Sequence, residues 1–254
     1  MRTLLALTLA GFREAIRNRV TVVVGVFAIA LILMTSVVLN VTIFSLDRVV
    51  TDFGLGVMSL ILIGLSIFMS VGMLSREIER RTVFLVVSRP LSRSTFVVGR
   101  YLGMAVTLTV LLLAMSLIYA TQIITFGVPP TPAMLAAIAG LWFELLVLSA
   151  MGVFFSSFSG NITATVCVVA LYLIGHWTPE LYTLSTTLPP ALGKVARLAY
   201  YLMPNLDRLD FKAHATYGLS IDVTDLLTGG ATALAWVCLF VGGATVIFSR
   251  RDFK

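Results

Sequence analysis

The segment from residue 76 to residue 100 holds the densest group of side chains that could act on a partner. It begins with alternating acidic and basic residues, continues with an apolar stretch, and is broken at Pro90. Glu77 precedes Arg81 by four positions, which is the favoured order for an ion pair on a helix. The spacing predicts a short rigid helix that transmits a movement of a cytosolic partner to the membrane domain. The candidate coupling residues are Glu77, Glu79, Arg80, Arg81, Thr82, Pro90 and Arg93. The alternative is a basic loop that only fixes the topology.

Glu144 is the second candidate, because it is the one acidic residue near the middle of a long apolar run. A charged carboxylate at the centre of a bilayer costs several kcal/mol, about 2.5–3.5 kcal/mol for Asp on insertion scales. We therefore expect Glu144 to face the bundle interior or to carry a proton. Two roles fit equally: a polar position on the translocation path or dimer interface, and a neutral side chain hydrogen-bonded to a neighbouring helix. Gln122 and His176 are expected to be packing residues near the outer surface.

Motifs that an enzyme would need are missing from the sequence. It has no phosphate loop of the form GxxxxGK followed by Ser or Thr, no GxSxG elbow and no HExxH motif. Its two histidines, His176 and His214, have no second histidine and no cysteine at helical spacing. We therefore expect no catalytic, cofactor-binding or metal-binding residue, and the energy for any work by this protein would have to come from elsewhere.

The elements that must position these residues are apolar helices. Mean hydropathy is +1.02 and 12% of the residues are charged, whereas about a quarter are charged in soluble domains. Six apolar runs reach the ~20 residues that a helix needs to cross a bilayer. The 254 residues are thus predicted to form a single all-α, polytopic membrane domain over residues 1–254. The predicted spans cover about 20–44, 53–74, 101–126, 133–155, a fifth that follows a turn at 156–161 and ends near Trp177, and 226–248.

Smaller expectations concern the spans and their ends. Small residues in the second span, at Gly56, Gly64 and Gly72, should let helices approach closely. Ser92 or Ser94 should cap the third span. A short outer loop should carry Asp47, Arg48 and Asp52, and prolines at 129, 130 and 132 should break the chain after the third span.

The charges predict the orientation. The first 19 residues, the 76–100 segment and the tail hold thirteen of the eighteen Lys and Arg residues, whereas the other five lie among seven acids. Lys and Arg near span ends mark the cytosolic side, so both termini and residues 76–100 are predicted to be cytosolic. An even number of spans agrees with this. The net charge of +6 is explained by basic residues that face anionic lipid head groups and the cytosol, so no nucleic acid partner is expected.

Two segments outside the spans are predicted to lie along the membrane. Residues 1–19 predict an amphipathic helix in the cytosolic interface, with Arg13, Arg17 and Arg19 as its candidate residues; an extension of the first span is the alternative. In the outer segment, residues 178–225, the pattern predicts a short helix over 191–203 that lies on or dips into the outer leaflet. A solvated loop is the alternative there.

Residues 76–100 resemble the cytosolic signature of type-2 ABC exporter permeases. In that signature an acidic pair and Gly-Thr lead through leucines to a Pro, an Arg and a Phe before the third span. The sequence departs from it at Arg81, where the family usually has Gly. The resemblance extends over the whole chain and includes the order of spans, the long outer segment and the basic ending at residues 248–253. Within the family, the chain resembles most the copper-processing branch, which serves nitrous oxide reductase maturation. The matching positions are Glu77, Glu79, Thr82, Ser88, Pro90, Arg93, Phe96, Gly99 and Arg100.

The resemblance implies a permease subunit in the bacterial inner (plasma) membrane. Its partners would be a separate cytosolic ABC ATPase, a second permease subunit in a homodimer, and membrane lipids. It also implies that the outer segment is a re-entrant hairpin that forms an outer gate. The alternatives are a secondary transporter or channel that works without an ATPase, and an intramembrane enzyme, which would need a nucleophile or metal cluster that the sequence lacks.

Overall fold

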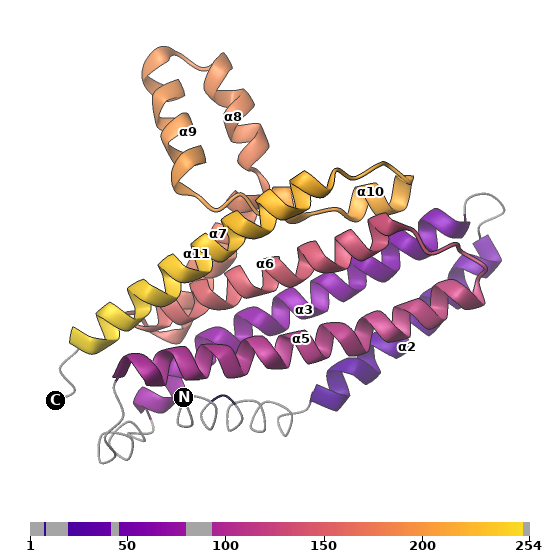
Figure 1. Ribbon diagram of the computed structural model, residues 1–254, viewed down its shortest axis with the longest axis horizontal. Coiled ribbons are helices and arrows are strands. Elements are labelled where there is room, and N and C mark those ends of the chain that lie inside the picture. Colours follow the sequence, from indigo (N-terminus) through magenta and orange to yellow (C-terminus); the bar gives the residue numbers. More distant parts are fainter. Residues whose placement is uncertain (1–7, 9–19, 42–45, 80–92, 251–254) are drawn as a thin grey trace.

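The chain folds into an elongated bundle of helices (Figure 1). The computed structural model describes residue 8 and residues 20–41, 46–79 and 93–250. No strand occurs in these ranges. The helices are α2 (Val20–Val41), α3 (Leu46–Glu79), α5 (Arg93–Thr125), α6 (Pro132–Ser156), α7 (Asn161–His176), α8 (Thr178–Thr187), α9 (Pro190–Leu202), the 3-10 helix η1 (Asp207–Leu209), α10 (Lys212–Tyr217) and α11 (Val223–Arg250).

Several of the described helices are long and apolar enough to cross a membrane. Four meet this test in α3, α5, α6 and α11, which are the predicted second, third, fourth and sixth spans. Helices α7 and α8 meet it together, but the pair is bent by 63°, so it is either a fifth span or a re-entrant element. In α2 the apolar stretch Val22–Leu33 is shorter. The all-α, multi-pass class is therefore confirmed, and six as the number of spans stays a prediction.

Helix α6 lies at the centre of the bundle. Its apolar window is 67% buried, against 28% in α11, which runs along the outside. A helix that is apolar on all sides suits such a position, because each face meets another helix. The Ser66 hydroxyl of α3 donates to the carbonyl of Leu145 at 3.3 Å, and the Tyr101 hydroxyl of α5 donates to that of Leu146 at 3.2 Å. These bonds tie both neighbours to the middle of α6.

The turn between α5 and α6 is dictated by its sequence. Gly127 adopts a left-handed conformation (φ 68°), and the amide of Val128 reaches back to the carbonyl of Ile123 at 2.9 Å. This is a Schellman ending, which favours glycine at that position. The Thr131 side chain then accepts a hydrogen bond from the amide of Met134, and Pro132 is the first residue of α6. The predicted break of the chain at the prolines is confirmed.

One expectation about the span ends is wrong. Helix α3 begins at Leu46, so Asp47, Arg48 and Asp52 lie in its first two turns and not in a loop. An acid in the first turn is favourable because it faces the positive end of the helix dipole. Helix α5 begins at Arg93, so Ser94 lies inside it, whereas Ser92 lies outside the described residues, and the cap by Ser92 or Ser94 stays a prediction.

The expected close approach at Gly56 and Gly64 is also wrong. A Cβ at either position would meet no atom within 4 Å. The approach occurs instead at Gly54, which lies against the ring of Tyr119, and at Gly140 of α6. Gly72 stays a prediction.

The contact at Gly140 generates a stability prediction. A Cβ there would meet the backbone carbonyl of Leu209, which cannot move without shifting the whole η1 segment. We expect Gly140→Ala to destabilise the protein by about 1–3 kcal/mol, as overpacking does, in thermal or denaturant unfolding in detergent. Gly64→Ala is the matched control, because a Cβ there meets open space; equal stability of the two variants would contradict the assigned contact.

Candidate functional site

Glu144 lies near the middle of α6 and is almost completely buried, with 1% of its surface exposed. The expectation that it faces the bundle interior is therefore confirmed. A buried carboxylate is costly unless it is protonated, paired or hydrogen-bonded. The groups around Glu144 thus decide what this site can do.

His176 is the group that reaches Glu144. It is the last residue of α7, and its Nε2 lies 3.4 Å from Oε1 of Glu144. This distance is within ion-pair range, but the two atoms lack hydrogen-bond geometry, and neither has a hydrogen-bond partner among the described residues. The sequence had placed His176 among packing residues near the outer surface; the structure brings it to Glu144, the one acid that is buried among the residues of described burial.

The other ring nitrogen of His176 fixes which tautomer is present. Nδ1 lies 3.1 Å from the backbone carbonyl of Tyr172, one turn earlier in α7. A carbonyl oxygen can only accept, so Nδ1 carries the hydrogen and donates it. Nε2 is then the nitrogen that gains or loses a proton, and it faces Glu144. The ring of Tyr172 lies against the imidazole, with centroids 4.5 Å apart, and restricts its rotation.

A returning piece of chain covers this pair. We call residues 203–217, which include η1 and α10, the closing segment. The amide of Leu206 donates to the carbonyl of Gly175 at 3.0 Å, which fixes the segment to the end of α7. The missing side chain of Gly140 lets the carbonyl of Leu209 rest against α6. Leu206 and Leu209 are themselves buried, so the segment forms part of the core.

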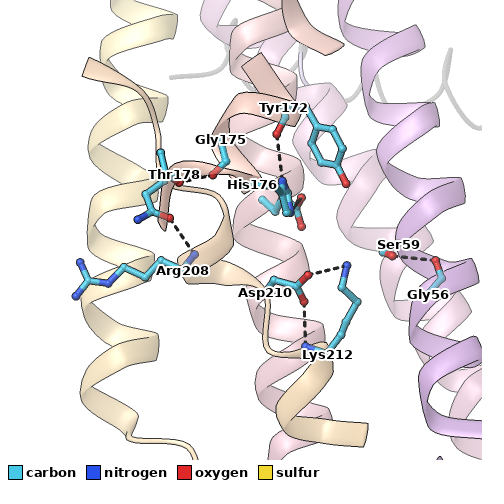
Figure 2. A network of polar contacts seen from close by, with 11 residues as sticks. Gly56, Ser59, Tyr172, Gly175, His176, Thr178, Arg208, Asp210 and Lys212 are labelled. Carbon is cyan, nitrogen blue, oxygen red and sulfur yellow. Dashed lines mark hydrogen bonds and ion pairs between the residues drawn. The ribbon is translucent and has the colours of Figure 1, made fainter. Parts of the chain in front are cut away.

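The closing segment brings two more charges to the site. Lys212 Nζ lies 3.1 Å from an Asp210 carboxylate oxygen, and the Lys212 amide donates to the other oxygen at 3.0 Å (Figure 2). Glu144, Asp210 and Lys212 line one cavity of about 10 Å³ together with apolar side chains. That volume is about what one water molecule requires. Lys212 attracts a negative charge on Glu144, whereas Asp210 repels it.

Asp207 in η1 belongs to the edge of the same group. Burial raises the pKa of its carboxyl, His176 opposes this rise, and the nearby acids Asp210 and Glu180 add to it. The site is therefore a cluster of three acids, one lysine and one histidine at the junction of α6, α7 and the closing segment. Among the described residues no group of three or more His, Cys, Asp or Glu side chains could hold a metal ion.

The predicted coupling residues lie far from this cluster. Helix α3 extends to Glu79, so Glu77 and Glu79 fall in its last turn, and Arg93 is the first residue of α5. Both helix ends lie at the same end of the bundle as the end of α11 (Figure 1). The rings of Phe96 and Phe248, 6.1 Å apart, confirm that α5 and α11 meet there. Arg80, Arg81, Thr82 and Pro90 lie outside the described residues, as do Arg13, Arg17 and Arg19 of the predicted interfacial helix.

The outer segment is helical, as predicted, but it contains more than one helix. Helix α9 (Pro190–Leu202) confirms the helix expected over 191–203, so the loop alternative is wrong. The residue pattern alone did not show that α8 would pair with α9, whereas the resemblance implied a hairpin in this segment. The ring of Tyr182 packs on that of Tyr200 at 5.3 Å, and Gly193 lies against the carbonyl of Ser185. The resulting hairpin projects sideways from the bundle (Figure 1).

Comparison with known proteins assigns no family. No protein-family model matches the chain, and no curated protein matches it either.

The burial of Glu144 beside two basic side chains predicts which substitutions at position 144 the fold tolerates. Glu144→Gln keeps the shape and should preserve a folded, monodisperse protein. Glu144→Lys would place a third basic group beside His176 and Lys212 in a buried position, and should cost about 3 kcal/mol or more. Size-exclusion profiles and unfolding midpoints of the purified variants measure this difference. Equal behaviour of Gln and Lys at this position would show that the site is not buried as described.

Proposed function

We propose that this protein is the permease subunit of an ATP-driven exporter of the type-2 ABC class. It would cross a bacterial inner membrane six times, with both termini in the cytoplasm. ATP and Mg²⁺ would be bound by a separate cytosolic ATPase, and the permease would work as a homodimer surrounded by lipid. Support comes from the resemblance of residues 76–100 and from the way α3 and α5 frame that segment.

The observation that carries the proposal is the continuity of α3. The helix runs without a break from Leu46 to Glu79, past the end of its apolar window at Gly72. Its 34 residues correspond to a rod about 50 Å long. One end carries the acidic pair of the candidate coupling segment. The other end contacts α10, where the Thr216 hydroxyl lies 3.4 Å from Asp52. A movement imposed at one end can therefore reach the closing segment at the other.

The charges at the two ends of the bundle agree with this orientation. Arg76, Arg93, Arg100 and Arg250 belong to the end where α3 stops, whereas Asp47, Asp52, Asp222 and Asp225 belong to the opposite end. Basic residues near span ends favour the cytosolic side.

A proton-coupled secondary transporter is the second candidate, because one observation favours it. Acids and histidines inside the membrane commonly form proton relays, and Glu144 and His176 meet within the bundle. Such a protein would move its solute without an ATPase. An intramembrane enzyme has no comparable support in the described residues.

Isolation of the tagged chain from its native membrane in mild detergent separates the two candidates. For an ABC permease we expect an ATP-hydrolysing subunit with a GxxxxGK motif to co-purify in equal amount, with two copies of each chain. Its ATPase rate should change when the permease is present in liposomes. Proton-driven solute movement by the chain without such a partner would favour the secondary transporter.

Substitutions at the ends of α3 and α5 test the coupling surface. Glu79→Ala and Arg93→Ala should leave membrane insertion and basal ATP hydrolysis intact, but reduce by roughly tenfold the ATP-dependent change at the far end. That change is measured as thiol labelling of Ala215→Cys in α10 with the ATPase bound. Lys194→Ala is the matched control, because it removes an exposed cation from the hairpin. A full ATP response in both coupling variants would remove the docking assignment.

A further inference from the structure

We propose that Glu144 and His176 together bind one exchangeable proton, and that this proton holds the closing segment shut over the bundle. The site is thus a proton-binding site built from α6 and α7, with residues 203–217 as the element that responds. It does not depend on an ATPase partner, so it holds or fails separately from the proposed exporter function.

The geometry around His176 leaves the pair two places for an exchangeable proton. Nδ1 keeps its hydrogen, because it donates to the Tyr172 carbonyl. One further proton can then lie on Nε2, which gives an ion pair with Glu144, or on the Glu144 carboxyl, which gives a neutral pair. The net charge of the pair is zero in both arrangements. The buried site therefore tolerates the presence of this proton in either place.

Loss of the proton leaves a negative charge on the buried Glu144 carboxylate. Glu144 has 1% of its surface exposed, and its Oε1 has no hydrogen-bond partner among the described residues. Lys212 could compensate such a charge, but it is already 3.1 Å from Asp210. The neighbouring helices supply mostly apolar walls at this level, among them Leu55 of α3 and Leu141 of α6. The titratable or charged groups that face the pair are Tyr172 of α7, Asp207 of η1, and Asp210 and Lys212 of the closing segment, with Glu180 of α8 acting on Asp207.

The closing segment is the element that can relieve this charge. It lines the cavity with Leu209, Asp210 and Lys212, so its displacement admits water to Glu144. Its attachment to α7 rests on the single backbone hydrogen bond from Leu206 to Gly175 and on apolar contacts. Breaking a buried charge pair by removing one member is strongly destabilising, and displacement of the closing segment would remove this cost by letting water reach Glu144.

The sign of the pH dependence follows from the number of bound protons. The closed state binds the shared proton, whereas the open state exposes Glu144 to water and releases it. Protons therefore favour the closed state, and closure is lost as the pH rises and Glu144 loses its share of the proton.

The test uses the full chain without an ATPase, in lipid nanodiscs that leave both membrane faces accessible. Cys167 and Cys238 are replaced by serine, and Ala215→Cys in α10 becomes the reporter, because Ala215 is buried. The labelling rate with a membrane-impermeant maleimide is measured against pH. Thiol chemistry itself depends on pH, so each rate is divided by that of the same reporter in a Glu144→Gln background.

We expect this ratio to be near one at acid pH and to rise by roughly tenfold or more as the pair loses its proton. Glu144→Gln cannot titrate and should stay closed at every pH. In His176→Gln the proton has one place fewer to occupy, so its step should move to lower pH. Lys194→Ala, in the exposed hairpin, should follow the unmodified chain.

Two outcomes would overturn the proposal. A ratio that stays flat across the pH range would show that Glu144 does not control the closing segment. A step at the same pH in His176→Gln would show that His176 does not share the proton. Either result leaves the ATPase experiments unaffected.

Discussion

The burial of one carboxyl group, that of Glu144, is the constraint on which this fold depends. An acid at the centre of an apolar bundle needs a partner at the same depth. Helix α7 provides it by being short: its 16 residues span about 24 Å, less than the ~30 Å of a hydrocarbon core. His176 therefore ends at the level of Glu144 instead of at the membrane surface. The chain then bends by 63° and leaves the bundle as the α8–α9 hairpin.

A short helix leaves part of the bundle to be filled, and the closing segment fills it. After the hairpin, residues 203–217 return over Gly175 and Gly140, two glycines against which backbone carbonyls lie. The same return carries Asp210 and Lys212 to the cavity beside Glu144. The polar site and the closing segment therefore occur together, because the segment that fills the space beyond α7 also carries the charged residues of the site. Irregular backbone is tolerated at membrane depth where it is buried in protein or lines a cavity.

The sequence predicted the helical class because four apolar runs are long enough to leave little choice. It also predicted the position of Glu144, since a lone acid in an apolar run must face inward. It placed the end of the fifth span near Trp177, one residue from the end of α7 at His176, but it could not show that the chain bends there by 63° or which helix the last residue of α7 faces. His176 was consequently expected to be a packing residue near the outer surface. One signal was available: it is the only histidine in the predicted fifth span, and the buried acid needed a basic partner.

The glycines also show that the sequence does not reveal which elements contact each other. Gly56 and Gly64 look like contact positions by residue type, yet they face open space, whereas Gly140 and Gly175 meet carbonyls from residues 204–209. Small residues permit close approach but do not say which element approaches. That information lies in long-range contacts between α6, α7 and the closing segment, which no local pattern contains.

Helix α10 is the place where the two proposed inputs to this protein would meet. It packs against α3, whose far end carries Glu77 and Glu79, and against α6, which carries Glu144. A force along α3 and a proton at Glu144 would then act on the same closed and open states. Two ligands that bias one equilibrium must influence each other reciprocally. A motor that opened the closing segment through α3 would thereby also weaken the hold of the site on its proton, whereas a rod and a proton site on separate elements would show no such link.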